Sequence, residues 1–208
     1  MPPFTVLHVC MGNICRSPMA ERLLDHAVRE RLARAGATSP AEELLHSHSA
    51  GTGGWHAGEE MNPPAARQVK ARGADPNGFI ARKLRSDLID AADLVLTATA
   101  DQQEYVVALR PDAAERTFVL GEFGRLLASV DLAALPAAVP TPDAVYARGV
   151  ALVEAVHAAR GTSTPLAADD LDDPWGRGDQ AFTRVADEIE DTVDPLARAL
   201  MPEAPASA

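Results

Sequence analysis

The residues of this chain that could do chemistry lie together in one short stretch near its start, residues 10–18. Cys10 follows an apolar run, residues 4–9, that has the composition of a buried strand, and Arg16 stands just before a helical pattern. A loop between a strand end and a helix N-terminus presents backbone N–H groups and the positive end of the helix dipole, which together hold an anion such as phosphate. The stretch therefore predicts a phosphate cradle that contains a thiol and a guanidinium.

Each polar residue of this loop has an expected task. In such a cradle the amides and the helix N-terminus favour the thiolate form of Cys10, which makes it a nucleophile. The planar guanidinium of Arg16 can meet two phosphate oxygens and stabilise the charge on a transferring phosphoryl group. We expect Gly12 to adopt a backbone angle closed to other residues and Asn13 to tolerate the left-handed region. The predicted phosphate-binding positions are Met11, Gly12, Asn13, Ile14, Cys15, Arg16 and Ser17.

Ser17 and Pro18 are predicted to be the N-cap and a first-turn residue of the following helix. The Ser17 hydroxyl could also donate its proton to the Cys10 sulfur. The loop Cys-Met-Gly-Asn-Ile-Cys-Arg-Ser-Pro at residues 10–18, followed by Met-Ala-Glu, resembles the signature loop of the low-molecular-weight protein tyrosine phosphatases. The resemblance implies hydrolysis of phosphotyrosine or another aryl phosphate through a cysteinyl-phosphate intermediate, without a cofactor or a metal.

Phosphoryl transfer to a thiolate leaves an alkoxide or phenoxide, which must be protonated by a positioned acid. Residues 173–175, Asp-Pro-Trp, resemble the Asp-Pro-Tyr motif of that family, and by this match Asp173 is the general acid that later activates water. Three further aspartates lie close by, at positions 169, 170 and 172. We choose Asp173 because it immediately precedes the proline.

Other site residues follow from the same resemblance. Trp55 and Trp175 fall in loops that the family places at the mouth of the pocket, where two aromatic walls would sandwich a phosphotyrosine ring. Ser49 matches the serine that supports the asparagine of the loop. Three positions depart from the family pattern: Phe79 replaces a histidine that braces the loop, Trp175 replaces a tyrosine, and residues 97–100, Thr-Ala-Thr-Ala, replace a Met-Asp or Met-Glu pair. We expect the support of the loop to differ accordingly.

The rest of the chain must position these residues. Short apolar runs alternate with helical patterns, which predicts an α/β three-layer sandwich, a parallel sheet with helices on both faces. Sites in such sheets lie beyond the carboxyl ends of the strands, which is where the loop at residues 10–18 would lie. The resemblance adds a four-stranded sheet in the order 2-1-3-4. Predicted strands are residues 4–9, 47–52, 94–97 and 117–120, predicted helices are residues 18–35, 63–72, 101–110 and 145–160, and Ser86 is predicted to cap a further short helix.

We expect one phosphatase domain over residues 1–201, with an insertion near 126–168 and a disordered tail at 202–208. The last helix should pack one apolar face on the sheet, formed by Phe182, Val185, Ile189, Val193, Leu196 and Leu200. Residues 38–42 are predicted to be a loop. Glu122 is predicted to be a solvated surface residue.

Composition limits the function classes. The net charge of −11 argues against nucleic acid as the main partner, and no apolar run is long enough for a membrane span. The start lacks the features of a secretory signal, so a cytoplasmic location is expected. Both cysteines, Cys10 and Cys15, lie in the loop, which suggests a redox switch and excludes a disulfide framework. His46, His48 and His56 are close in sequence but lack a carboxylate or thiol that would complete a metal site.

Two other functions remain open. Arsenate mimics phosphate, so an arsenate reductase that uses a small external thiol would fit the loop, whereas a self-contained one would need further cysteines. A non-catalytic phosphate-binding regulatory module would also use the cradle. The expected substrate is a phosphotyrosyl protein or a small phosphate ester.

Overall fold

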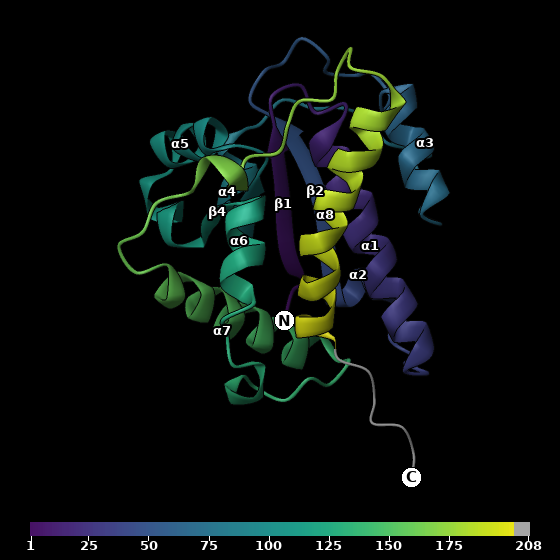
Figure 1. The fold of residues 1–208 in the computed structure, drawn as a ribbon. Coiled ribbons are helices and arrows are strands. Elements are labelled where there is room, and N and C mark those ends of the chain that lie inside the picture. Colours follow the sequence, from purple (N-terminus) through teal and green to yellow (C-terminus); the bar gives the residue numbers. More distant parts are fainter. Residues whose placement is uncertain (202–208) are drawn as a thin grey trace.

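A four-stranded parallel sheet forms the centre of the computed structural model, which describes residues 1–201 (Figure 1). The strands are β1 (Phe4–Cys10), β2 (Leu45–Gly51), β3 (Leu94–Thr97) and β4 (Thr117–Val119). Their order is β2-β1-β3-β4, so the predicted α/β fold and the predicted strand order are confirmed. The predicted tail, residues 202–208, lies outside the described residues.

The register brings the carboxyl ends of the inner strands to one edge of the sheet. Cys10 pairs with Gly51 at the end of β2, and Val9 pairs with Thr97 at the end of β3. The Ala98 N–H continues this pairing by donating to the Val9 carbonyl (2.8 Å). Loops that follow β1, β2 and β3 therefore meet at this edge, as expected for a site in an α/β sheet.

Helices and short helical turns cover both faces of the sheet. The larger core lies between the sheet and α1, α6, α7 and α8, and Figure 1 shows α8 between α1 and α6. The second core holds Leu7, Val9 and Val95 against α4, α5 and η1. The helical elements are α1 (Arg16–Arg34), α2 (Ala41–Leu44), α3 (Pro63–Ala71), α4 (Ser86–Asp90), α5 (Ala100–Leu109), η1 (Pro111–Arg116), α6 (Leu120–Leu127), η2 (Leu132–Ala134), α7 (Pro142–Arg160), η3 (Ala167–Asp169) and α8 (Asp179–Leu200). All six residues of the predicted apolar face of α8 are buried.

Two helices were not predicted. Residues 41–44 form α2 where a loop was expected, and α6 follows β4 without a turn. The start of α6 is closed by its own Glu122, whose Oε2 accepts the Val119 N–H (3.2 Å). This contact allows the helix to begin directly at a strand end, which the sequence pattern alone does not reveal. No helix within residues 1–201 has both the length and the apolar character needed to cross a membrane.

The segment for which we predict an insertion, residues 126–168, contains η2, α7 and most of η3. Helix α7 packs on the sheet through Gly149, where an added Cβ would lie 2.4 Å from the Phe4 ring. Arg148, which is also buried, donates to the Ala199 carbonyl (2.5 Å) at the end of α8 and to the Pro136 carbonyl. The segment therefore packs into the same core as the rest of the chain.

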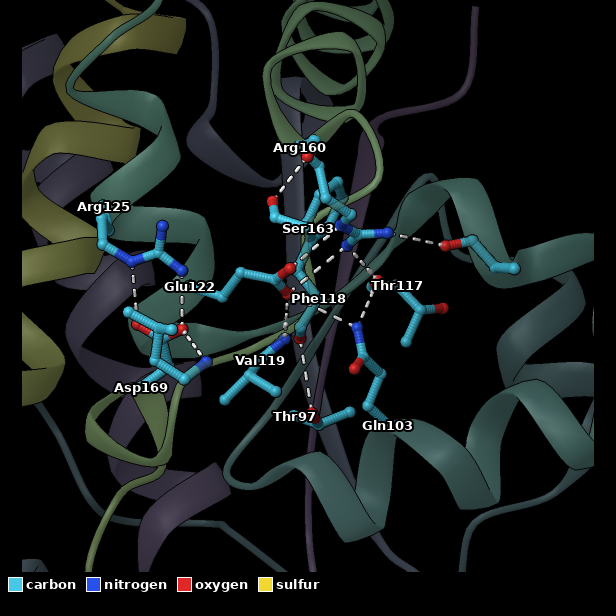
Figure 2. Close-up of polar contacts among 12 residues, drawn as sticks. Thr97, Gln103, Thr117, Phe118, Val119, Glu122, Arg125, Arg160, Ser163 and Asp169 are labelled. Carbon is cyan, nitrogen blue, oxygen red and sulfur yellow. Dashed lines mark hydrogen bonds and ion pairs between the residues drawn. The ribbon is translucent and has the colours of Figure 1, made fainter.

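Glu122 is buried, not solvated as predicted; its exposed fraction is 1%. Its Oε1 lies 3.0 Å from Nε of Arg160, and the Arg160 guanidinium lies 3.7 Å above the Phe118 ring (Figure 2). Arg160 also donates to the Thr117 carbonyl (2.6 Å). Because α7 supplies the arginine from 38 positions along the chain, the sequence pattern could not show that this carboxylate has a partner.

We predict that Arg160→Ala lowers the free energy of unfolding by about 3–5 kcal/mol, because it leaves the carboxylate of Glu122 buried without its cation. Equilibrium unfolding in urea measures this change. Arg85→Ala is the matched control, since the ion pair of Arg85 with Asp87 lies on the surface. The urea midpoint of this variant should be nearly that of wild type. Equal midpoints for the two variants would contradict the structural role of Arg160.

Candidate active site

Residues 11–15 form the loop between the end of β1 and the start of α1, so Cys10 lies at the strand end and Arg16 opens the helix. Carbonyl groups of this loop are held by neighbouring segments: that of Met11 accepts from the Gly53 N–H and that of Ile14 from the Asn62 N–H, each at 2.9 Å. The N–H groups of Gly12, Ile14 and Cys15 have no hydrogen-bond partner within residues 1–201. Carbonyls turned outward and N–H groups left unpaired are the arrangement that an anion cradle needs.

The unusual backbone conformation falls on Asn13, whose φ is 55°, as predicted for this residue. Gly12 does not adopt a positive φ, so the prediction of a special backbone angle there is wrong. What Gly12 provides is space, because an added Cβ would lie 3.1 Å from Cδ2 of His56. The His56 ring therefore packs against the loop at the position where a side chain is absent.

A hydrogen-bond network orients the hydroxyl proton that lies nearest Cys10 Sγ. Asn13 Oδ1 accepts the Arg82 N–H (2.8 Å), so the amide nitrogen is turned to two hydroxyl groups, Ser17 Oγ (2.9 Å) and Ser49 Oγ (2.8 Å). Because Ser17 Oγ accepts from this amide, its own proton is available for Cys10 Sγ, 3.0 Å away. The Asn13 N–H also donates to that sulfur (3.3 Å). Two donors thus stabilise a negative charge on Cys10.

Ser17 is not the N-cap of α1 as predicted. The helix begins at Arg16, two residues earlier than predicted, its N-cap is Cys15, and no side chain caps it. The Ser17 hydroxyl is used on Cys10 Sγ instead, while Pro18 lies in the first turn as expected. The open helix end leaves its N–H groups for an anion.

Glu21 extends the network beyond the residues that the sequence analysis assigned. Ser49 Oγ accepts from Asn13 and donates its proton to Glu21 Oε2 (2.6 Å). Burial raises the pKa of Glu21, against the hydrogen bond from Ser49. Glu21 is part of the motif that carries the resemblance, but its partner on β2 becomes visible only in three dimensions.

Phe79 lies in the hydrophobic core and makes no polar contact with the loop. The segment after it supplies support from Arg82, whose N–H holds Asn13 and whose Nε donates to the Ser49 carbonyl (2.8 Å). The Arg82 guanidinium also contacts Nδ1 of His48 (2.7 Å), and burial first, then the charges of His46 and Arg82, lower the pKa of His48 to about 3. Backbone and arginine contacts therefore brace the loop where a side-chain histidine is absent.

Arg16 and Asp173 meet directly. Arg16 is buried, and its guanidinium donates to the Leu171 carbonyl (3.0 Å) and to Asp173 Oδ2 (3.0 Å). The other carboxylate oxygen of Asp173 accepts the Trp175 N–H (3.1 Å). The side chain of Asp173 is half exposed, so it is accessible from the mouth of the site.

A cavity of about 220 Å³ joins these residues. Its lining includes the buried residues Cys10 and Arg16 and the half-exposed side chain of Asp173. Trp55 and Trp175 also line the cavity, and their exposed fractions of 62% and 64% show that both rings stand at its rim. The cavity is lined by Cys10, Met11, Gly12, Ile14, Cys15, Arg16, Trp55, His56, Asp173 and Trp175. It therefore brings together the predicted nucleophile, phosphate ligand, acid and aromatic walls from three distant parts of the chain.

The three histidines that are close in sequence separate in the structure. His46 and His48 stack on β2 with ring centroids 4.8 Å apart, whereas His56 lies at the cavity and contacts Glu59 (2.8 Å). Within the described part of the chain, no three His, Cys, Asp or Glu side chains are placed to hold a metal ion.

Comparison with known proteins decides the family. A sequence model described as low molecular weight phosphotyrosine protein phosphatase matches residues 5–134, more than half of the chain. The chain belongs to this phosphatase family. A low molecular weight protein-tyrosine-phosphatase of Streptomyces coelicolor is 32% identical over 165 residues, which is 79% of this chain and 92% of that protein. The family and the enzyme class predicted from the loop are thus confirmed.

Solved structures agree on the fold of this phosphatase. A protein tyrosine phosphatase from Entamoeba histolytica superposes with a TM-score of 0.64 at 21% identity, covering 92% of this chain and 93% of that one. The YwlE arginine phosphatase from Geobacillus stearothermophilus superposes with a TM-score of 0.62 at 24% identity, covering 94% and 92%. At these identities the likeness shows the fold and leaves the phosphorylated residue that each site accepts to be argued from the site.

Proposed function

We propose that this phosphatase hydrolyses phosphotyrosine and related aryl phosphate monoesters through a phosphorylated Cys10. The observation that carries the proposal is the single cavity that joins Cys10, Arg16 and Asp173 beneath two tryptophan rings. A nucleophile with two hydrogen-bond donors, a buried guanidinium and a carboxylic acid are the groups that a two-step phosphoryl transfer requires.

In the first step the Cys10 sulfur attacks phosphorus, the S–P bond forms, and the bond from phosphorus to the ester oxygen breaks. Asp173 gives its proton to the departing phenol oxygen. In the second step Asp173 takes a proton from water, the water oxygen bonds to phosphorus, and the S–P bond breaks to release phosphate and the free Cys10. Arg16 holds the phosphoryl oxygens throughout.

The contact between Arg16 and Asp173 supports a role for phosphate binding in releasing the acid. A bound phosphate takes the guanidinium, so Asp173 loses its cationic partner and gains an anionic neighbour. The carboxyl of Asp173 is then no longer held by Arg16 and can serve the ester oxygen of the substrate. The aromatic rim then favours a phenol over an alkyl alcohol as the leaving group.

The test is hydrolysis of para-nitrophenyl phosphate and of phosphotyrosyl peptides by wild type and by Asp173→Ala. We expect a vanadate-sensitive activity in wild type and a drop of about 100-fold or more in Asp173→Ala on the phosphotyrosyl peptides, whose phenol leaving group needs a proton, with a smaller loss on para-nitrophenyl phosphate. Phosphoarginine peptides and arsenate with a small thiol donor form two further arms, and we expect phosphotyrosine to be the preferred substrate. Absence of hydrolysis in wild type, or preference for either other substrate, would overturn the proposal.

We also propose a redox role for Cys15, which is buried in the same loop. Peroxide would oxidise Cys10 to a sulfenic acid, and the Cys15 thiolate would attack it to form a disulfide with loss of hydroxide. Burial, and next the neighbouring Cys10 sulfur, raise the pKa of Cys15 to about 12. Since the thiolate fraction then grows about tenfold per pH unit, we predict that disulfide formation accelerates between about pH 7 and pH 9.

Recovery of activity by dithiothreitol after a peroxide pulse measures this protection. Wild type should recover, and Cys15→Ser should remain inactive because the sulfenic acid oxidises further. Equal recovery of the two proteins would rule out this role for Cys15.

A further inference from the structure

Two glycines with positive φ, Gly176 and Gly178, follow Asp173 before α8 begins at Asp179, and the side chain of Asp173 is half exposed. On the N-terminal side, the loop is attached to the rest of the fold by Asp169, Asp170 and Leu171, which we call the acid-loop stem. All three of these residues contact other elements.

Asp169 attaches the stem to α6. Its two carboxylate oxygens accept from Nε (3.1 Å) and Nη2 (2.7 Å) of Arg125, and Oδ2 also accepts the Leu166 N–H (2.7 Å) (Figure 2). Asp169 is buried, whereas its partner is partly exposed. Burial alone would raise the pKa of Asp169, but the hydrogen bonds from Arg125 and Leu166 outweigh it and lower the pKa. The Asp169 carboxylate is thus held in its charged form by a bidentate ion pair with Arg125.

The backbone of the stem also lies directly on α6. An added Cβ on Gly121 would come within 2.5 Å of the Asp169 carbonyl oxygen and 2.8 Å of its Cα. Only a glycine at this position allows such an approach. The stem is therefore fixed to α6 by packing as well as by charge.

Asp170 and Leu171 attach the stem to the end of β3. Asp170 Oδ1 accepts the Ala100 N–H (2.8 Å), the first N–H of α5, whose own N-cap Thr99 makes no side-chain hydrogen bond. The Leu171 N–H donates to the Ala98 carbonyl (2.8 Å). A carboxylate at a helix N-terminus is stabilised by the unpaired N–H groups and by the helix dipole.

A short chain of hydrogen bonds connects the stem to Cys10 and Arg16. The Ala98 N–H donates a hydrogen bond to the carbonyl of Val9, the residue before Cys10, and the Leu171 carbonyl accepts one from the Arg16 guanidinium. The segment at residues 97–100, where the family pattern has a Met-Asp or Met-Glu pair, is the one that receives Asp170. The stem thus contacts α6 and the start of α5 directly and is linked to β1 through Ala98, and Asp173 follows two residues later.

We propose that Asp169 and Asp170 are positioning residues, which hold the acid-loop stem so that Asp173 stands over the bond to be broken. This inference rests on the proposed role of Asp173 as general acid. Neither residue touches the substrate; each acts by restricting where the next part of the chain can lie. Misplacement of a catalytic group by about 1 Å can cost about 100-fold in rate, so a loosened stem should weaken protonation of the leaving group.

Asp170→Ala and Asp170→Asn form the deciding pair. Both remove the charge, but the asparagine keeps an oxygen that can accept the Ala100 N–H. We measure kcat/KM for phenyl phosphate, whose leaving group needs a proton, and for para-nitrophenyl phosphate, whose leaving group needs it far less. Asp170→Ala should lose about 10- to 100-fold on phenyl phosphate and less than about threefold on para-nitrophenyl phosphate, and Asp170→Asn should retain most of both activities.

Two further variants test the contacts between the stem and α6. They keep the proposal testable even if an Asp170 variant fails to fold. Arg125→Gln removes the ion pair of Asp169, and Gly121→Ala pushes on its backbone; both should show the same selective loss on phenyl phosphate. Asp172→Asn is the control, because Asp172 is exposed and pairs with two exposed arginines, Arg177 in the loop and Arg184 on α8, and its rate ratio should equal that of wild type.

Asp173→Ala distinguishes the general-acid role of Asp173 from the positioning roles of Asp169 and Asp170. If it shows no selective loss on phenyl phosphate, the general-acid role fails. If it shows the loss while the Asp170 and α6 variants keep the wild-type ratio, or lose both activities equally, the positioning role is overturned.

Discussion

Cys10→Ser is expected to abolish turnover, with a fall in kcat of about 10⁵-fold or more. A serine hydroxyl at this position would receive the same two donors, Ser17 Oγ and the Asn13 N–H, but it stays protonated where a thiol can ionise. The cradle itself is unchanged, so inorganic phosphate should still bind. Steady-state hydrolysis of para-nitrophenyl phosphate measures the loss, and isothermal titration with phosphate measures the remaining binding.

Measuring turnover and phosphate binding on the same variant separates a loss of chemistry from a loss of the phosphate site. Lost turnover with retained phosphate binding assigns chemistry to the sulfur atom. A serine variant that retains more than about a tenth of the wild-type kcat would show that another group attacks phosphorus, and would refute the proposed intermediate.

Arg16→Lys is expected to lower kcat/KM by about 10³-fold, although it conserves the charge. The guanidinium of Arg16 is buried and already makes two hydrogen bonds in one plane, to Leu171 and to Asp173, and we expect the same fork to hold two phosphate oxygens. An ammonium group cannot reproduce this planar geometry. Arg16→Lys would also loosen the resting contact with Asp173.

Steady-state kinetics with para-nitrophenyl phosphate and the inhibition constant of phosphate should change together, since the same fork holds substrate and product. Arg177→Lys provides the control, because Arg177 is an exposed residue of the acid loop and should behave as wild type. A variant Arg16→Lys within about tenfold of wild type would mean that the charge of Arg16 matters and its fork does not.

The fold could be predicted from local patterns and from the resemblance because each strand is a short buried run and each crossover is a recognisable helix. The ends of elements were less predictable. Helix α6 follows β4 without a turn, since Glu122 closes its first turn from within, and Glu122 itself is buried by an arginine that arrives from α7. A periodic pattern carries no information on such a distant partner.

Within the site, the sequence by itself predicted the chemistry. Cys10 and Arg16 could be named because their residue types suit a nucleophile and a phosphate ligand and both belong to one loop between a strand and a helix, and Asp173 could be named because Asp-Pro-Trp resembles the acid motif of the family. The tertiary structure decided how these groups are held. It placed Ser17 on the sulfur rather than at a helix cap, gave Gly12 the task of making room for His56, and replaced a bracing histidine by contacts from Arg82.

The four aspartates at and near the Asp-Pro-Trp motif show most clearly what the sequence predicts and what only the folded chain decides. In the sequence, positions 169, 170, 172 and 173 differ only in their distance from a proline. In the folded chain Asp169 is buried against Arg125, Asp170 receives the first N–H of α5, Asp172 lies among exposed arginines, and Asp173 faces the cavity. What a carboxylate does depends on which donors and charges surround it, and for these residues the surroundings come from elements far away in the chain.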